Sequence, residues 1–501
     1  MGAFLARTNS EPDSPAIITT AATISWADLE TRASRVANGL RASGLNVGDR
    51  WALLAGNCLE WPELYLGNAF AGTKYVPLNW HLTVPELVYL LDNSGATFLI
   101  VDRKNEQNGR DAAGQHGIPD DRIVVIGDDY DSWRDSFPDE RPDNDVTGSA
   151  LLYTGGTTGR SKGVVRADSG AGLQQWLAGT KAWGSHVHMP ESGPILITTP
   201  LYHAYGAGVL QACMSRGHTI VLRERFDIDS FFADIEQHGI AGAPLVPTLM
   251  IRLAKLDDSA FAAHDLSSLK WICHTAAPCP AWAKQRLIDL LGPIVVEFYG
   301  SSEGTGPCVC TSEEWMARPG TVGRPNPALK VSVVDENGND VPVGGIGTLY
   351  FARNDGAPEY HGDPDKTDSS RLPDGRFTVG DVGYIDADNF IYLADRRVDL
   401  ILAGGVNVYP AEIEAAISEH PAVRDVAVFG IPHAELGEEV KAAVEVEPGH
   451  SVSAEEIIAW CRDRLAGFKC PKSVDFHDAL PREAHGKLKK RFLRDAYWPA
   501  T

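Results

Sequence analysis

YTGGTTGRSKG, at residues 153–163, places four glycines, three threonines and one lysine within eleven positions. Glycines let successive backbone N–H groups converge on an anion, and threonine hydroxyls and a lysine add donors and positive charge. This is the composition that a triphosphate requires. A surface turn is the simpler alternative, but the concentration of these residue types favours a phosphate-binding loop.

The flanks of this loop distinguish it from the common P-loop. In a P-loop the lysine follows a glycine, precedes Ser or Thr, and opens a helix. Here Lys162 follows Ser161 and precedes Gly163. The apolar segments on either side, ALLY and GVVR, predict strands. The sequence therefore predicts a phosphate-binding loop between two strands.

On both sides of the loop, helical and strand patterns alternate. Apolar residues at Leu29, Ala33, Val36 and Leu40 have the spacing of an amphipathic helix, and the strand pattern WALLAG follows. The alternation continues through RIVVIG, GPILITT, HTIVLRE, LKWICHT and PIVVEFYG. This order predicts an α/β fold with mostly parallel sheets.

The C-terminal part of the chain shows two other patterns. Alternating strands around Asn337 and Gly338 predict a small antiparallel β subdomain, and from about residue 399 helices and strands predict a compact α/β unit. We therefore expect an α/β protein with a large N-terminal body at residues 1–395, a β subdomain within it at about 321–395, a hinge at 396–398, and a small mobile lid at 399–501.

Charge limits the classes of partner. The chain has 501 residues, and 45 basic against 67 acidic side chains give a formal net charge of −22. Nucleic-acid binding and docking on anionic lipid both need a positive surface, so these classes are excluded. A small anion in a locally basic pocket is not excluded. The composition, 44% hydrophobic and 22% charged, also excludes a disordered chain.

The cysteines bear on the compartment. Eight cysteines are scattered along the chain, and the pair Cys308 and Cys310 has no second pair at zinc-finger spacing. No secretory leader or membrane-spanning pattern is evident, so we expect reduced thiols and a cytoplasmic protein.

Residues 153–163 resemble the phosphate-binding signature of the adenylate-forming superfamily, which includes acyl-CoA synthetases, adenylation domains and luciferases. The usual form is [ST]-S-G-T-T-G-x-P-K-G, and this chain departs from it at Gly155 and Ser161. The resemblance covers the whole chain and implies that the loop holds the β- and γ-phosphates of ATP. The residues so implicated are Thr154, Gly155, Gly156, Thr157, Thr158, Gly159 and Lys162.

Three further motifs carry the resemblance: WICHTAAPCP, EFYGSSEG, and the pair FTVGDVGY and ADRRVD. A turn of small residues lets a flat base approach the backbone, and a carboxylate can accept hydrogen bonds from both ribose hydroxyls. The resemblance implies adenine contacts from Ala276, Ala277, Pro278 and Tyr299, an α-phosphate contact from Ser302, Mg²⁺ binding by Glu303, and ribose contacts from Asp381 and Arg396.

The lid motifs imply a two-step reaction. In the superfamily the lid swings between a pose that presents a lysine for adenylation and a pose that opens a thiol channel. Lys487 in PREAHGKLKK resembles that lysine, and Gly404 with Gly405 would line the coenzyme A tunnel. At the hinge the family usually has Asp or Lys where this chain has Val398, which bears on the balance between the two poses.

The acyl site is implied by PLYHAYGAG. His203 and Tyr205 in this segment, together with Gly300, match positions beside the acyl group, although a core histidine explains His203 equally well. Small residues at 206–208 favour room for a bulky acid.

The resemblance implies an ATP-dependent acyl-CoA ligase that uses Mg²⁺ and coenzyme A, with Lys487, Glu303 and Ser302 as its catalytic residues. Three alternatives stay open: an enzyme specialised for one half-reaction, an adenylation enzyme that loads a carrier-protein phosphopantetheine, and a non-catalytic nucleotide or acyl-adenylate binding protein. The identity of the carboxylic acid is also open, as is the oligomeric state, with a homodimer as one option.

Overall fold

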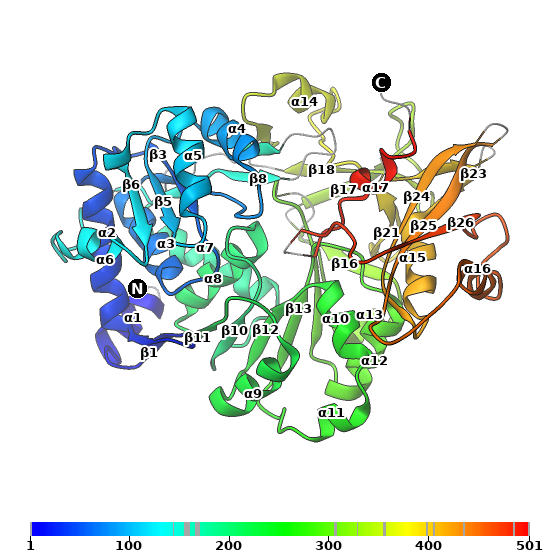
Figure 1. Cartoon of the computed structure of the whole chain (residues 1–501), viewed down its shortest axis with the longest axis horizontal. Coiled ribbons are helices and arrows are strands. Elements are labelled where there is room, and N and C mark those ends of the chain that lie inside the picture. The colour runs from blue at the N-terminus through cyan, green and yellow to red at the C-terminus, as the bar shows by residue number, and fades with distance from the viewer. Residues whose placement is uncertain are drawn as a thin grey trace.

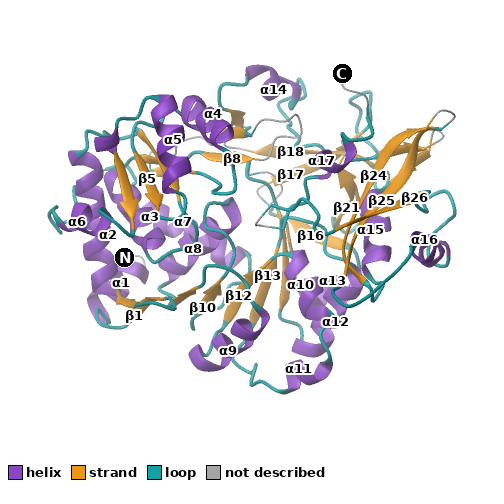
Figure 2. Cartoon of the chain, in the orientation of Figure 1, coloured by secondary structure: helices purple, strands orange, loops and turns teal. Residues whose placement is uncertain are grey.

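The computed structural model describes residues 3–498 apart from residues 144, 155–160, 166–170, 305–307, 328, 354–356, 397–398, 404–405, 434–435 and 484–485. Figure 1 shows the N-terminal strands and helices on the left, the central sheet in the middle and the C-terminal unit on the right. Helices flank the strands of each unit (Figure 2), as the α/β pattern predicts.

The N-terminal unit is a parallel sheet with the strand order β6-β5-β3-β4-β7. Alternate residues of its strands point to opposite faces. One face packs on α4 and α5 and the other on α2 and α3. The elements are α2 (Trp26–Ala42), β3 (Arg50–Leu54), α3 (Glu60–Ala71), β4 (Lys74–Pro77), α4 (Val84–Ser94), β5 (Leu99–Asp102), α5 (Glu106–His116), β6 (Ile123–Ile126), α6 (Tyr130–Asp135) and β7 (Ser149–Ala150).

The helix expected around residues 28–40 is confirmed as α2. Its N-terminus is closed by a capping box in which Ser25 accepts from the backbone of Asp28 and the Asp28 carboxylate accepts in return from the backbone of Ser25. Its buried face carries Leu29, Ala33 and Val36.

The central sheet has 13 strands among the described residues, in the order β17-β18-β20-β21-β16-β15-β14-β13-β12-β10-β11-β1-β2. Along this order the neighbours from β1 to β14 pair in parallel. Strand β2 pairs antiparallel with β1, and the strands from β14 to β17 in the same order also pair antiparallel. Their bounds are β1 (Pro15–Ile18), β2 (Thr23–Ser25), β10 (Ile195–Ile197), β11 (Ile220–Leu222), β12 (Gly242–Leu245), β13 (Trp271–His274), β14 (Val295–Tyr299), β15 (Cys308–Cys310), β16 (Thr321–Pro325), β17 (Leu329–Val334), β18 (Gly347–Arg353), β20 (Asp381–Ile385) and β21 (Ile391–Arg396).

Two helical layers cover the parallel half of this sheet. Helices α7 and α8 share a core with the N-terminal unit, and α9, α10, α11 and α12 form a second core on the opposite face. The antiparallel strands expected after residue 321 are confirmed, and β16 joins them to the long sheet. The helices of the body outside the first unit are α1 (Ala3–Ser10), α7 (Leu173–His186), α8 (Ala204–Arg216), α9 (Ile228–His238), α10 (Pro247–Ala254), α11 (Asp258–Ala262), α12 (Ala281–Leu291), α13 (Ser312–Ala317) and α14 (Pro364–Ser369).

A small sheet carries the phosphate-loop motif. Strands β8 (Leu152–Thr154) and β9 (Lys162–Val165) form the two arms that the sequence predicts, and the backbone of Thr154 pairs with that of Lys162. A third strand, β19 (Glu359–Tyr360), pairs with β9. Segments some two hundred positions apart thus meet at this hairpin.

The C-terminal unit has its own sheet, ordered β23-β22-β25-β24 with β26 paired to β25. We refer to residues 399–501 as the lid and to the preceding residues as the body. The lid elements are β22 (Ile401–Ala403), β23 (Val406–Val408), α15 (Pro410–Ser418), β24 (Val423–His433), β25 (Gly437–Val446), α16 (Ala454–Arg462), β26 (Ser473–His477) and α17 (Lys490–Arg494). None of the helices in the described part of the chain has the length and apolar character that a bilayer crossing requires.

Candidate active site

The motif residues gather at the carboxyl ends of β13 and β14. Tyr299 ends β14, and its hydroxyl donates to Oδ2 of Asp381 at 2.6 Å. Asp381 is buried at the start of β20, where its backbone pairs with that of Arg396. The residues expected at adenine and ribose are therefore neighbours, although the side chain of Arg396 lies outside the described residues.

The small-residue turn follows the adjacent strand β13. Ala276 has a φ of +79°, a left-handed conformation that a residue with a side chain seldom adopts. Ala276 and Pro278 are exposed, and Ala277 is half-buried. The turn thus presents backbone and small side chains beside Tyr299, as a flat base requires, and the strained residue sits where strain commonly marks a binding site.

Tyr360, which the sequence did not indicate, links Lys162 of the phosphate-loop motif to Glu303, the candidate metal ligand. Lys162 Nζ lies 3.0 Å from Oδ2 of Asp363 and 5.7 Å from the ring centre of Tyr360. The hydroxyl of Tyr360 donates to Oε1 of Glu303 at 3.1 Å. Most of the loop between β8 and β9 lies outside the described residues, as does the side chain of Thr154. The predicted phosphate-binding residues affected are Gly155, Gly156, Thr157, Thr158 and Gly159.

Tyr360 and Asp363 belong to no recognisable motif. They reach the site because β19 pairs with β9, placing Tyr360 opposite Val164. Only knowledge of that strand pairing could have identified them. Gly300 directly follows β14 and Ser302 directly precedes Glu303, and both are half-buried.

The residues expected at the acyl group lie at the start of α8. His203 is the N-cap residue of this helix, and its ring lies 4.2 Å from that of Tyr202. The hydroxyl of Tyr205 donates to the carbonyl of Cys273 at 2.6 Å. The Tyr205 contact places the start of α8 at the carboxyl end of β13, which precedes the small-residue turn.

The small residues of α8 serve different purposes. A Cβ on Gly206 would lie 2.3 Å from the carbonyl oxygen of Pro200, so backbone packing, rather than room for an acid, requires glycine there. A Cβ on Gly208 would instead lie 3.7 Å from the ring of Trp183. Trp183 meets Phe298 edge-on at 5.7 Å, and both are partly exposed aromatic residues that the sequence did not single out.

The lid loop that carries Lys487 lies against the body. Gly486 has a φ of +84°, and a Cβ there would lie 2.9 Å from Oγ1 of Thr248 and 3.2 Å from Val246, at the start of α10. Within the lid, Arg482 binds Asp425 with contacts of 2.5 and 2.7 Å and donates to the carbonyl of Gly486 at 2.5 Å. Lys487 is half-buried at this junction.

Three other predicted positions cannot be placed. Gly404, Gly405 and Val398 lie outside the described residues, so their assignment to the coenzyme A tunnel and the hinge stays a prediction.

A buried charged cluster lies next to the small-residue turn that follows β13. Lys284 on α12 donates to Oε2 of Glu297 at 2.7 Å, and Nε2 of His274 lies 3.8 Å from the same oxygen. His274 and Lys284 are fully buried. Burial lowers the pKa of His274 to about 4, so this imidazole is neutral at physiological pH. The cluster ties β13, β14 and α12 together beneath the segments that the sequence predicts to bind the nucleotide.

The donor set is compatible with Mg²⁺. Among the described residues no cluster of three His, Cys, Asp or Glu side chains has the arrangement of an all-protein metal site. Mg²⁺ is commonly held by one or two carboxylates together with substrate phosphates and water. Glu303, half-buried and next to the phosphate-loop arm, provides a carboxylate of this kind.

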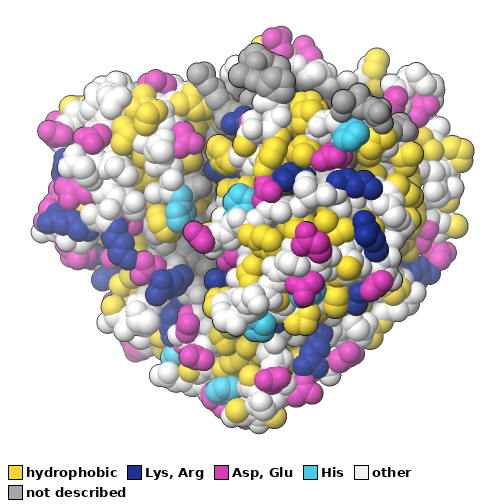
Figure 3. Space-filling model, turned by 45° about the vertical axis from the view of Figure 1, so that its right-hand side comes forward, with side chains coloured by type: hydrophobic (Ala, Val, Ile, Leu, Met, Phe, Trp, Pro, Cys, Tyr) yellow, Lys and Arg dark blue, Asp and Glu magenta, His cyan; other side chains and the backbone are white. Residues whose placement is uncertain are grey.

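On the face seen in Figure 3, Lys and Arg side chains are interspersed with acidic and hydrophobic ones and form no continuous basic field. On this face the cationic groups are therefore scattered among acidic ones, in keeping with the net charge of −22.

Comparison with known proteins identifies the family. The model of the AMP-binding enzymes matches residues 4–361, and that of the AMP-binding enzyme C-terminal domain matches residues 412–487. This chain is similar to a feruloyl-CoA synthase of an Amycolatopsis species, with 33% identity over 97% of each chain. It is also similar to the fatty acid–[acyl-carrier-protein] ligase ScoC of Streptomyces coeruleorubidus, with 32% identity over 97% of this chain and 94% of that protein.

A solved structure extends the similarity to three dimensions. The crystal structure of ATP-bound MatB from Rhodopseudomonas palustris matches with a TM-score of 0.84 at 29% identity, covering 99% of each chain. The α/β fold with a large N-terminal domain and a small C-terminal domain is thereby confirmed. The family expected from the sequence motifs is confirmed as well: the chain belongs to the AMP-binding enzymes.

Proposed function

We propose that this protein is an ATP-dependent acyl-CoA ligase, which activates a carboxylic acid as its acyl-adenylate and transfers the acyl group to the thiol of coenzyme A. The observation that carries the proposal is that four features meet near the carboxyl ends of β13 and β14. They are the Tyr299–Asp381 contact, the turn at Ala276, the contacts that join Lys162 through Tyr360 to Glu303, and the lid loop before Lys487. Relatives named as ligases of acids to thiols support it.

In the first step the carboxylate attacks the α-phosphorus of ATP and pyrophosphate leaves. The chain's contribution is alignment and charge stabilisation, because phosphoryl and nucleotidyl transfers depend mainly on these two effects. Tyr299 and the Ala276 turn hold the base, Asp381 and Arg396 the ribose, and the loop from Thr154 to Lys162 the β- and γ-phosphates. Ser302 donates to the α-phosphate, and Lys487 stabilises the negative charge that develops there.

We assign Mg²⁺ to Glu303. When bound, the ion neutralises phosphate charge. Tyr360 orients the Glu303 carboxylate by donating to Oε1.

In the second step the coenzyme A thiol attacks the acyl-adenylate and AMP leaves. We propose that the body at residues 1–395 stays in place while the lid at 399–501 turns about residues 396–398, which removes Lys487 and brings Gly404 and Gly405 to the thiol channel. The eight cysteines are free, and neither step requires a cysteine nucleophile. Free thiols also support our proposal of a cytoplasmic location.

The decisive experiment is a panel of carboxylic acids with ATP, Mg²⁺ and coenzyme A, read by AMP formation and by the mass of the product. Aromatic, fatty and polycyclic acids are included because the acid is unassigned. We expect acid-dependent AMP and one preferred acyl-CoA. If no acid in the panel raised AMP formation above the background rate, the proposal would be contradicted.

A carrier-protein acceptor is the second candidate, favoured by the similarity to ScoC, whose name states an acyl-carrier-protein acceptor. Coenzyme A and a holo carrier protein, supplied in parallel with the same acid, separate the two. Comparing pyrophosphate release with thioester formation from synthetic adenylate tests for specialisation in one half-reaction.

A further inference from the structure

The lid contacts two helices of the body, α10 and α12, which begin near the carboxyl ends of β12 and β13. Helix α10 follows β12 directly, and α12 follows the small-residue turn at residues 275–280. Both helices present side chains to the same part of the lid, where α15 ends and β24 begins.

The first contact is made by Lys255, the C-cap residue of α10. Its half-buried ammonium donates to the backbone carbonyl of Val423, the first residue of β24. Burial lowers the pKa of Lys255, while the lid carboxylates of Glu447 and Asp425 act in the opposite direction. A body cation is thus bonded to a lid carbonyl, and two lid carboxylates interact with it electrostatically.

The second contact is made by Trp282, the second residue of α12. Its indole Nε1 donates to Oγ of Ser418 at 3.1 Å, and Ser418 is buried at the last position of α15. Trp282 lies two residues after the small-residue turn at 275–280, so this contact joins the lid to the segment that we expect to hold the base.

A continuous set of contacts runs from these residues to Lys487. Val423 and Asp425 lie on β24, Asp425 binds Arg482, and Arg482 holds the carbonyl of Gly486, which precedes Lys487. Gly486 in turn touches Thr248 at the other end of α10. Helix α10 therefore meets the lid at both of its ends.

We propose that Lys255 and Trp282 are positioning residues for adenylation, seating the lid so that Lys487 faces the nucleotide. Neither residue touches substrate, and both act through the lid. This inference rests on the proposed two-step function. It goes beyond that function by naming the body residues that set the equilibrium between the lid poses.

The test separates the half-reactions. Lys255→Met keeps the aliphatic chain and removes the cation, and Trp282→Phe keeps an aromatic ring and removes the N–H donor. We expect each variant to slow acid-dependent pyrophosphate release about five- to tenfold, the scale of one hydrogen bond. Thioester formation from synthetic acyl-adenylate and coenzyme A should stay within about twofold, because that step does not use this pose. Lys270→Met, at an exposed lysine just before β13, is the matched control and should leave both rates unchanged.

A second readout does not depend on catalysis. Amide hydrogen exchange of the substrate-free protein should be faster at residues 418–426 in both variants and unchanged in the core strand β25. An equal fall in both half-reactions, no fall in either, or unchanged exchange at 418–426 would overturn the proposal. If the wild-type protein activates no acid, the proposed function fails, and the exchange result alone still decides whether these residues seat the lid.

Discussion

Lys487 is the residue on which we propose that the first half-reaction depends most. We predict that Lys487→Ala lowers acid-dependent pyrophosphate release by about 10²–10³-fold, the scale of one lost charge-stabilising donor. Thioester formation from supplied acyl-adenylate should be largely retained, because we propose that Lys487 leaves the site in that pose. Rapid-quench measurement of each half-reaction checks this, and an equal loss of both would remove Lys487 from its role.

Trp183 is the residue that we expect to limit the size of the acid. It packs edge-on against Phe298 and stands 3.7 Å from the Cβ position of Gly208, on the helix that carries Tyr205. Trp183→Ala should raise kcat/KM for acids larger than the preferred one by about tenfold or more, since apolar pockets discriminate on that scale for small changes in size. Trp183→Phe should give an intermediate profile. An unchanged order of preference across the acid panel would place the acyl group elsewhere.

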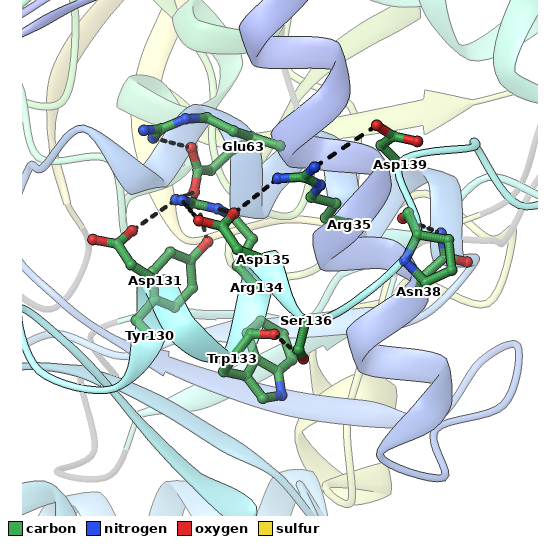
Figure 4. A network of polar contacts seen from close by, with 12 residues as sticks. Arg35, Asn38, Glu63, Tyr130, Asp131, Trp133, Arg134, Asp135, Ser136 and Asp139 are labelled. Carbon is green, nitrogen blue, oxygen red and sulfur yellow. Dashed lines mark hydrogen bonds and ion pairs between the residues drawn. The ribbon is translucent and has the colours of Figure 1, made fainter.

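At the scale of elements, a buried ion network holds α2, α3 and α6 together (Figure 4). Glu63 on α3 is fully buried and accepts from Arg32 at 2.9 Å, Arg134 at 3.0 Å and the hydroxyl of Tyr130 at 2.8 Å. Nearby, Arg35 pairs with Asp135 and Asp139 at the surface.

We predict that Glu63→Gln lowers the free energy of unfolding by about 3 kcal/mol, because it leaves two guanidinium groups without their buried counter-charge. Arg35→Ala should cost less than about 1 kcal/mol, as exposed pairs usually do. Urea titration of both variants provides the comparison, and similar losses from the two would show that burial does not govern this network.

Elements were predicted better than the contacts between them. The spacing of Leu29, Ala33 and Val36 predicted α2, and the apolar segments beside the glycine-rich loop predicted the strands β8 and β9, because both patterns act over short distances in the chain. The motifs also indicated Tyr299 and Asp381, which the structure brings into contact. Tyr360 was missed because its place depends on strand pairing across the chain. Lys255 and Trp282 were missed because their partners lie in the lid, and no local pattern reports a contact between domains.

At the scale of the whole molecule, His274 should make stability depend on pH. Its pKa is lowered by burial from 6.5 to about 4, with Lys284 acting in the same direction and Glu297 opposing. Between these values the unfolded chain binds a proton that the folded chain does not. The free energy of unfolding should therefore fall as the pH falls from about 6.5 to 4, by up to about 1.4 kcal/mol per pH unit.

Chemical denaturation at several pH values, with His274→Gln as the comparison, measures this contribution. The variant should show a shallower slope across the window. Some pH dependence should remain in the variant because of Glu297. Burial raises the pKa of this carboxyl, but Lys284 outweighs burial and lowers it. Glu297 therefore also lowers the free energy of unfolding as the pH falls, at lower pH than His274. Identical slopes in the two proteins would mean that His274 does not remain neutral when folded.

The pairing of β9 with β19 has a consequence for synthesis on the ribosome. Val164 leaves the ribosome long before Tyr360, its partner in the small sheet. At about 5–20 residues per second, the roughly 200 residues between them take about 10–40 s to translate. During that interval the strand that carries Lys162 can pair with β8 but lacks its second neighbour, β19. Once Glu303 has been made, it still lacks the hydroxyl of Tyr360. We therefore expect a nascent chain shorter than about 360 residues to hold most of the proposed nucleotide motifs without a complete site, and to bind ATP only late in translation.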